Sequence, residues 1–422
     1  METSNTPKQR NTNNQPAMSH WKEYKLGEIG KIITGTTPPT KNPENYGNFL
    51  LFVTPTDFDA YNKTVNNSIR SISEIAVNKF KNRIIPKDSV IVTCIGSQMG
   101  KVAINKKACL TNQQINSIIP NKEFDSDFIY YTLKSMQDYL RNLATGGSTM
   151  PIINKSSFEN ITITVPPLPT QTAIASILSS LDQKIELNNA INRNLEALAQ
   201  ALFKQWFVEF EFPVDQNGNF SPLTGEMSQG QRGYKSSGGE MVESELGMIP
   251  KGWRVRKLNE VIEVKYGKDH KHLEDGDIPV YGSGGIMRYA NKSLYCNQSI
   301  LIPRKGTLSN MFLINEPFWS VDTMFYTIIK IDFYAKYLFY TLKSFDLASM
   351  NVGSAVPSMT TKVLNDLSII LPSDNIIKRF DEAVNPIFDN KDAVIKENHS
   401  ISILRDTLLP KLISGELEVK DV

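Results

Sequence analysis

The sequence predicts a mixed α+β fold of the broad α/β class, in which two globular domains are separated by two long helices paired as an antiparallel coiled coil. Three observations predict it: an internal repeat that relates the two halves by a pseudo-two-fold, two long segments with an apolar seam, and short β-branched runs between turn clusters. A chain of 422 residues is long enough for two or three separate cores.

The internal repeat organises the chain. Four segments recur in the same order: WKEYKLGEI and WRVRKLNEV (21–29 and 253–261), FIYYTLKS and YLFYTLKS (128–135 and 337–344), GSTMP and GSAVP (147–151 and 353–357), and ITITVPP and LSIILPS (161–167 and 367–373). The first pair is offset by 232 residues and the other three by 206 to 209. Each half therefore has a variable first portion and a uniform second portion, which is typical of a duplicated scaffold with two different recognition surfaces.

The uniform portions end in long helical patterns. Over positions 174–206, seam residues recur at alternating spacings of four and three, with Asn188 and Asn192 as polar interruptions. A similar rhythm covers 377–401, where Pro386 should kink the helix. Such a seam is typical of a coiled coil, and a buried Asn in it often fixes the register. We expect the two helices to pair with each other, although each could instead pack within its own half.

Short strands and a short helix are expected in each half. The β-branched runs at 89–96, 116–120, 299–303 and 323–331 predict strands. The repeated octet predicts a helix under these strands, with its aromatic side chains in the core: Tyr130, Tyr131, Phe339 and Tyr340.

These patterns divide the chain into six segments. They are a polar tail (1–20), a first domain (21–168), a central helix (169–212), a linker rich in Gly, Ser and Pro (213–250), a second domain (251–372) and a C-terminal helix (373–422). The tail has no apolar core and predicts neither order nor an export signal.

Composition narrows the class of protein. Hydrophobic residues make up 40% and charged residues 21%, and no run of about 18 apolar residues predicts a membrane span. The three scattered cysteines, Cys94, Cys109 and Cys296, fit neither a disulfide framework nor a zinc site and indicate the cytoplasm. His270 and His272 could hold a metal, but solvated loop histidines explain them better, so we expect no metal site.

The net charge of +2 hides an uneven distribution. Residues 21–135 carry 15 Lys and Arg against 10 Asp and Glu, and residues 251–345 carry 14 against 9. The segments 169–212, 213–250 and 373–422 are acidic, with 3 against 5, 2 against 5 and 7 against 10. The pattern could be chance scatter, but it also fits two basic domains that face a polyanion.

No catalytic motif can be assembled. The segment GSQMGKV (96–102) has three residues between its glycines and Val after the Lys, so it is not a Walker A loop. The glycines of YGSGGIM (281–287) lack dinucleotide-fingerprint spacing. No Asn-Pro-Pro-Tyr type motif of an amino-methyltransferase occurs, and Glu418-Val-Lys420 is a weak match to a nuclease site. The chain is therefore expected to be non-catalytic, to bind no cofactor and to recognise rather than react.

Polar loops supply side chains that can contact DNA bases. Amides bond adenine, arginine bonds guanine, and lysine near glycine suits phosphate. Each residue could equally be a solvated turn residue, but together on basic domains they favour base recognition. The predicted DNA-binding residues are Ser97, Gln98, Lys101, Asn112, Gln113 and Gln114 in the first domain, and Ser283, Arg304, Lys305, Thr307 and Ser309 in the second.

The ordered set of motifs resembles the specificity subunit of type I restriction–modification systems, over nearly the whole chain from Trp21. The segments that carry the resemblance are the paired Trp-x3-Lys-Leu motifs at Trp21 and Trp253, GSQMGKVAI with TNQQINSIIP, PVYGSGG, PRKGT…FW…DTMFYTI, both TLKS…GS…P segments and the connector YKSSGGEMVESELGMIPKGW.

The resemblance implies two target-recognition domains that each read half of a split, asymmetric site in double-stranded DNA. It also implies two methyltransferase subunits docked on the helices, and translocase–nuclease restriction subunits. S-adenosylmethionine, ATP and Mg²⁺ would bind those partners and not this chain. About 35 helical residues span ~50 Å, and one turn of B-DNA advances ~34–36 Å, so two domains could reach successive major grooves.

Two other functions stay open at this stage. The chain could be a solitary DNA-binding adaptor without restriction partners, or an enzyme with an unrecognised site. The target bases and the length of the gap between half-sites do not follow from the sequence.

Overall fold

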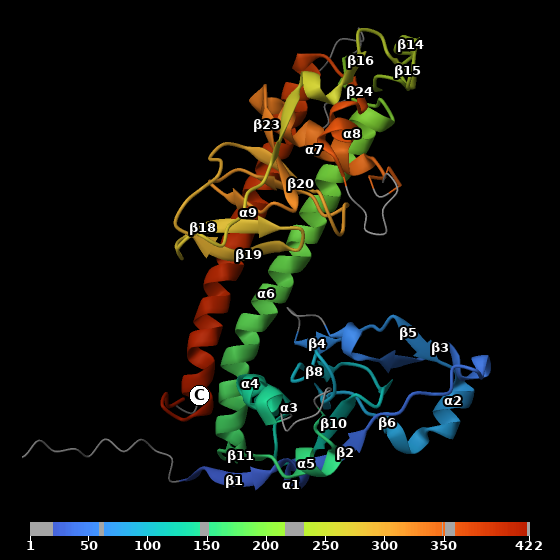
Figure 1. Ribbon diagram of the computed structural model, residues 1–422. Helices are drawn as coiled ribbons and strands as arrows, with labels where there is room; N and C mark the ends of the chain where they lie inside the picture. Colours follow the sequence, from blue (N-terminus) through green and yellow to red (C-terminus); the bar gives the residue numbers. More distant parts are fainter. Residues whose placement is uncertain are drawn as a thin grey trace, which may run out of the picture. The chain divides into compact units, whose positions relative to one another are not determined.

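The chain folds as two compact units, Met1–Ile191 with Val394–Val422, and Asn192–Ala393. The computed structural model describes residues 20–58, 63–143, 152–215, 232–347, 349–350 and 359–419 (Figure 1). Most of the predicted tail and the repeated segments 147–151 and 353–357 lie outside these residues, apart from His20. Each unit contains a mixed α/β domain and part of both long helices, which confirms the predicted fold class.

Unit 1 contains two larger sheets. The first has strand order β2-β10-β7-β8-β4, with β2 Gly30–Thr34, β10 Ile115–Pro120, β7 Val90–Thr93, β8 Val102–Asn105 and β4 Thr64–Val65. The second has order β5-β3-β9-β6, with β5 Arg70–Ile72, β3 Tyr46–Val53, β9 Cys109–Thr111 and β6 Ile84–Ile85. The predicted strands at 89–96 and 116–120 thus form the adjacent strands β7 and β10 of the first sheet.

Burial on both faces explains the continuous apolar run of β7. Val90 and Val92 belong to the core that contains the octet helix α3 (Ser126–Ser135), whereas Ile91 between them belongs to the core on the other side. Successive side chains of a strand point to opposite faces, so every residue of β7 must be compatible with burial.

The other α-helices described in this domain are α1 (Leu26–Ile29), α2 (Glu74–Lys79), α4 (Gln137–Leu143) and α5 (Lys155–Glu159).

Unit 2 repeats most of the sheet topology of unit 1, with one strand fewer in each of its two larger sheets as described. Its larger sheet has order β17-β23-β20-β21, with β17 Ile262–Tyr266, β23 Met324–Ile329, β20 Ser299–Pro303 and β21 Phe312–Ile314. Its smaller sheet has order β19-β18-β22, with β18 Ile278–Gly282, β19 Gly285–Ala290 and β22 Trp319–Ser320. Strands β17, β23, β20 and β21 correspond in order to β2, β10, β7 and β8. The predicted strands at 299–303 and 323–331 are therefore confirmed as β20 and β23.

The repeated sequence segments form the same supporting elements in both units. The octets are the helices α3 and α7 (Ala335–Ser344), and the four aromatic side chains predicted for the core are at most 5% exposed. The Trp-x3-Lys-Leu motifs form β1 (Lys22–Lys25) and β16 (Arg254–Lys257). These strands pair antiparallel with β11 (Thr162–Val165) and β24 (Ser368–Leu371), which are the repeated segments before the long helices. Helix α8 (Thr361–Asn365) precedes β24.

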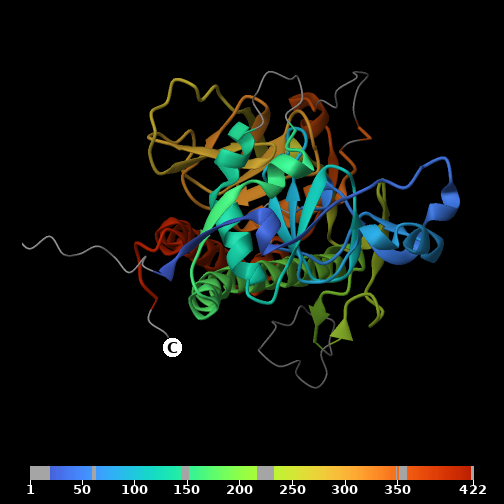
Figure 2. The same cartoon turned by 90° about the horizontal axis from the view of Figure 1, so that it is seen from below.

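The long helices are α6 (Leu168–Phe203), which continues into a π-helical turn at Lys204–Val208, and α9 (Asp374–Ile413). Within each unit they run side by side (Figures 1 and 2). In unit 1, Asn188 donates to the side-chain oxygens of Glu397 at 2.7 Å and Asn398 at 2.8 Å, and is 1% exposed. In unit 2, Lys391 pairs with Glu196. Both pairings are antiparallel, as predicted, and α9 continues through Pro386 without ending.

The predicted linker forms small strand pairs where the structure describes it. Strand β12 (Pro213–Val214) pairs with β13 (Arg232–Gly233), and β14 (Met241–Ser244) forms a hairpin with β15 (Gly247–Pro250). Phe212, just before β12, stacks on Trp253 with ring centroids 5.5 Å apart, so this part of the connector packs on unit 2. No helix within the described residues is long and apolar enough to cross a membrane.

Candidate nucleic-acid interface

Two loops of unit 1 meet at one end of the five-stranded sheet. Residues 94–101 join β7 to β8, and residues 112–114 join β9 to β10. Because β7 and β10 are antiparallel neighbours, the end of β7 lies beside the start of β10. The Cys94 N–H donates to the Gln114 carbonyl at 2.7 Å, which ties the two loops together. We call these two loops the first edge.

The β7–β8 loop holds a lysine–glutamine pair near the surface. Gly96 and Gly100 have φ angles of 85° and 83°, in the left-handed region that favours glycine, and they let the loop turn back to β8. Lys101 Nζ donates to Gln98 Oε1 at 2.9 Å, and Ser97 is exposed between the glycines. The loop therefore presents an ammonium group and an amide in a fixed relation.

Of the three amide side chains in the β9–β10 loop, one is buried in the turn and the other two lie nearer the surface. Asn112 is only 8% exposed. Its Nδ2 donates to Gln114 Oε1 at 2.9 Å, and its Oδ1 accepts from the Gln114 N–H at 3.1 Å. Gln113 is exposed and accepts from the Thr37 hydroxyl. Asn112 thus shapes the turn, while Gln113 and Gln114 lie closer to solvent. The structure brings together all six residues predicted for the first domain.

Unit 2 has a corresponding second edge, made of the loop 304–310, the turn at Ser283 and the last residue of β17. β23 runs antiparallel to both β17 and β20, so the ends of those two strands meet at its start. The Arg304 N–H donates to the Thr323 carbonyl at 2.8 Å, and Asn310 Nδ2 donates to the Ser283 carbonyl at 2.6 Å. All five residues predicted for the second domain therefore lie at this edge.

One buried leucine anchors the loop of the second edge in the core of unit 2. Leu308 is 2% exposed and belongs to the main core of unit 2, whereas Lys305, Thr307 and Ser309 around it are exposed. Anchoring one apolar residue lowers the conformational freedom of its polar neighbours, which favours specific contacts. This loop joins β20 to β21 and so corresponds to the β7–β8 loop of the first edge.

Two aromatic–arginine pairs were missed by the sequence analysis. The Arg304 guanidinium lies 5.3 Å from the Tyr266 ring centroid, and Tyr266 is 50% exposed. In unit 1, the Arg70 guanidinium lies 5.1 Å from the Phe52 ring centroid. Phe52 pairs with Leu110 of β9, just before the first edge. Each pair joins residues that are far apart in the sequence, so no local pattern marks it, although an exposed aromatic residue at a strand end next to glycine is a weak signal for Tyr266.

Among the described residues, no carboxylate neutralises the charged groups of the two edges. Within the described ranges, Lys101, Arg304 and Lys305 form no ion pair, in contrast to Arg288, which pairs with Asp275 at 3.1 Å. Unpaired cations near neutral amides are suited to phosphate and base contacts. Across the residues with described positions, no three His, Cys, Asp or Glu side chains group as a metal site, including the region around His270 and His272.

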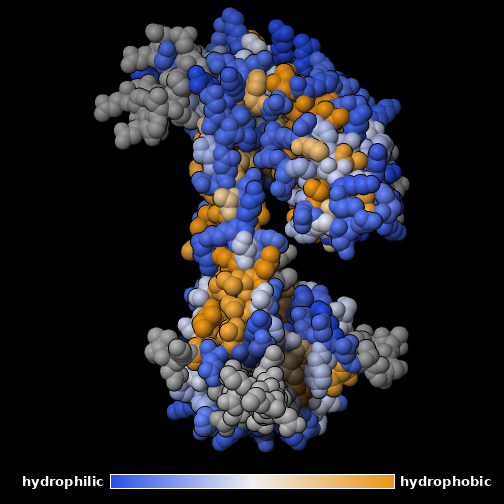
Figure 3. Space-filling view, turned by 90° about the vertical axis from the view of Figure 1, so that its left-hand side faces the viewer, coloured by the Kyte–Doolittle hydropathy of each residue, from blue (hydrophilic) through white to orange (hydrophobic). Residues whose placement is uncertain are grey.

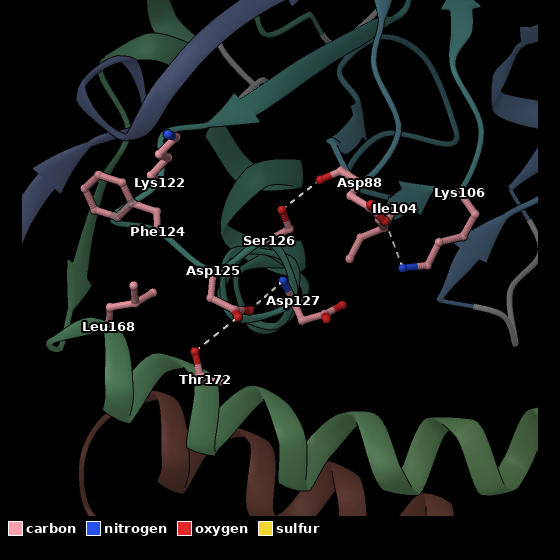
Figure 4. Close-up of a pocket in the computed structure, with 10 residues that line it drawn as sticks. All are labelled: Asp88, Ile104, Lys106, Lys122, Phe124, Asp125, Ser126, Asp127, Leu168 and Thr172. Carbon is pink, nitrogen blue, oxygen red and sulfur yellow. Dashed lines mark hydrogen bonds and ion pairs between the residues drawn. The ribbon is translucent and has the colours of Figure 1, made fainter.

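A separate hollow of about 420 Å³ lies between the start of α3 and α6 (Figure 4). Its acidic residues are engaged in structural contacts. Asp125 accepts from the N–H groups of Asp127 and Phe128 at 2.9 Å each and caps α3, while Asp88 pairs with Lys106 at 3.1 Å. Asp125 also accepts from the Thr172 hydroxyl of α6 at 3.4 Å, so this carboxylate contributes to the contact between the domain and its long helix.

Comparisons with known proteins agree with this architecture. Residues 18–197 and 250–400 match the family described as type I restriction modification DNA specificity domain. The chain is 29% identical to the MjaIX type I restriction enzyme specificity subunit of Methanocaldococcus jannaschii, over 95% of this chain and 94% of that protein. It is 24% identical to the HindI specificity subunit of Haemophilus influenzae, over 95% of this chain and all of that protein.

A solved structure has the same fold. The S subunit of a type I restriction–modification system from M. genitalium matches with a TM-score of 0.55 at 19% identity, over 95% of this chain and 97% of that one. The two matched segments cover well over half of the sequence and coincide with its two repeated halves. This chain therefore belongs to the type I restriction–modification DNA specificity family.

Proposed function

We propose that the chain recognises a bipartite, asymmetric target in double-stranded DNA and directs adenine methylation or restriction by partner subunits. One observation carries the proposal: equivalent loops on equivalent sheets carry different polar side chains. The β7–β8 loop presents Gln98 and Lys101, whereas the β20–β21 loop presents Arg304 and Lys305. Identical supports with different recognition groups fit two different half-sites, and chemically different edges make the whole target asymmetric.

Catalysis is assigned to the partners. Two methyltransferase subunits would supply S-adenosylmethionine, and restriction subunits would supply ATP and Mg²⁺. This assignment of catalysis to the partners is supported by the polar groups at the two edges, which are amides, hydroxyls and cations suited to binding. The complex would act on DNA in the cytoplasm, which fits the three free cysteines.

The long helices of unit 1 offer a surface for the methyltransferase. Figure 3 shows hydrophobic residues gathered over this part of the helices. The exposed apolar side chains on α6 and α9 in unit 1 include Ile177, Leu187, Ile191, Ile395, Ile403 and Leu404, which are 37 to 57% exposed. Large exposed apolar patches on a soluble protein usually mark protein contacts. Leu187→Lys with Ile403→Lys should prevent complex formation, whereas the same charge at the exposed Ser157 on α5 should not.

The decisive experiment combines the chain with its methyltransferase partners and a randomised DNA library. Sequencing of N6-methyladenine should show two short blocks of fixed bases separated by a gap of constant length. Gln113→Ala should change base preference in one block and Lys305→Ala should lower methylation through the other. A single contiguous target, or methylation by this chain alone, would contradict the proposal.

A further inference from the structure

We propose that Arg304 reads a guanine in one half of the DNA target, and that Tyr266 is the residue that positions its guanidinium. The inference rests on the proposed function and names the base that the second edge recognises. It also adds Tyr266, which the sequence analysis did not include, to the recognition surface.

The backbone of Arg304 is fixed from both sides. Its N–H donates to the Thr323 carbonyl at 2.8 Å, and its carbonyl accepts from the Met359 N–H at 2.9 Å. Arg304 also follows Pro303 of β20 directly, and that residue pairs with Met324 of β23. The Cα atom of Arg304 therefore has a defined place at the end of the sheet, although its side chain is partly exposed.

The guanidinium is held by a ring and keeps most of its donors. It lies 5.3 Å from the Tyr266 centroid, and its one protein hydrogen bond within the described residues is a long one, 3.4 Å from Nη1 to the Asp322 carbonyl. Tyr266 is itself held by an edge-on contact with Phe325 at 5.1 Å. Stacking on a fixed ring restricts the long arginine side chain without using its N–H groups.

Two other arginines of the same domain are already engaged. Arg288 donates to the Leu273 carbonyl at 2.8 Å and to Asp275 at 3.1 Å. Arg256, on the separate β16–β24 sheet, pairs with Glu260 at 3.6 Å. The Arg304 guanidinium lies over the Tyr266 ring and has no carboxylate partner within the described residues. A planar fork with two free donors matches O6 and N7 of guanine, which is the commonest specific arginine contact in the major groove.

A phosphate contact is the alternative use of the same side chain. Phosphate contacts position a protein on DNA without distinguishing bases, so loss of Arg304 would then weaken binding to all sequences alike. A base contact predicts a different result: loss of preference at one position of the target, with the other positions unchanged.

The test uses the complex with its methyltransferase partners and the randomised library described above. The motif of the unchanged complex should contain a guanine that Arg304→Ala relaxes by about tenfold or more, in line with a bidentate contact. Tyr266→Ala should relax the same position less, and Tyr266→Phe should retain the preference because the ring remains. Arg256→Ala is the matched control and should leave the whole motif unchanged. Thermal unfolding of each variant shows whether the fold is kept.

The outcomes separate this inference from the proposed function. If the unchanged complex methylates no discrete bipartite motif, the proposed function fails. If it does methylate such a motif, but Arg304→Ala lowers methylation uniformly or relaxes a base other than guanine, only the guanine assignment is overturned. If Tyr266→Ala relaxes nothing while Arg304→Ala does, the positioning role of Tyr266 is overturned.

Discussion

Arg405 Nη1 donates to a carboxylate oxygen of Asp182 at 2.8 Å, and the two side chains are 14% and 7% exposed. The contact joins α9 to α6 within unit 1. The other carboxylate oxygen of Asp182 accepts from the Tyr131 hydroxyl of α3 at 2.7 Å. Burial, together with the charge of Asp182 and this hydrogen bond, raises the pKa of Tyr131 well above its usual range. One carboxylate therefore binds the repeated octet helix to both long helices.

In unit 2, a carboxylate of α6 again joins the octet helix to α9, but both of its partners are lysines. Glu196 of α6 pairs with Lys343 of the octet helix α7 at 3.0 Å and with Lys391 of α9. The repeated octets thus attach each domain to the helix pair.

Replacing Asp182 by Asn should destabilise unit 1. The substitution leaves the Arg405 charge buried without its partner, and breaking a buried pair is costly. We expect a loss of roughly 3 kcal/mol, at the low end of the range for such pairs, because Asp406 still contacts Arg405 at 2.8 Å. Urea unfolding of the unchanged chain and of the variant measures this loss in the free energy of unfolding. Glu159→Gln, which breaks an exposed pair with Lys155, should cost less than about 0.5 kcal/mol. Equal effects of the two variants would contradict the structural role of Asp182.

Unit 2 should lose stability in acid through Glu196. Burial alone would raise the pKa of Glu196, but the hydrogen bonds and charges of Lys391 and Lys343 outweigh it and hold the pKa below its ordinary value. A carboxyl whose pKa is lower in the folded protein stabilises it above the unfolded pKa, and this contribution disappears as the pH falls through the folded pKa.

Denaturant unfolding at several pH values between about 6 and 3 tests this dependence, since a free Glu titrates near 4.3. Glu196→Gln should be less stable at pH 6 and should show a shallower decrease toward pH 3. The matched control is Glu23→Gln on β1 of unit 1, where the side chain is exposed. A slope for Glu196→Gln as steep as that of the unchanged chain would show that Glu196 does not carry the effect.

Four strands, the octet helices and the seam of the long helices could be predicted because their signals are local. The apolar run around Val90–Thr93 and the seam around Asn188 follow from burial patterns that repeat every few residues. The stack of Arg304 on Tyr266 could not be predicted, because it depends on how β17 and β20 both pair with β23. The burial of Asn112 was missed for a similar reason: the closed geometry of its turn, and not the residue type, directs the amide inward.

One of the three thiols should react quickly with a thiol reagent. Burial raises the pKa of Cys94 and of Cys109 to about 12 each, so at pH 8 only about one in 10⁴ of each is the reactive thiolate. Cys296 is exposed, and its sulfur forms a hydrogen bond with the Ser293 hydroxyl at 3.2 Å. Labelling of the native chain should give one fast equivalent, and Cys296→Ser should remove it. Fast reaction of a second thiol would show that unit 1 opens readily around Cys94 or Cys109.

Lys101 should contribute to DNA affinity through phosphate. Its ammonium is directed by Gln98 Oε1 and has no carboxylate partner in the described part of the chain. A lysine that neutralises one phosphate releases about one condensed cation, so Lys101→Ala should reduce the slope of log K against log salt by about 1. Titrations of the complex with its methyltransferase partners from low to moderate salt measure this slope. Lys155→Ala on α5 is the control, because Lys155 Nζ already forms an ion pair with Glu159 Oε1 at 3.3 Å. If Lys101→Ala instead changes the base preference and leaves the slope unaltered, Lys101 contacts a base edge and the phosphate assignment is wrong.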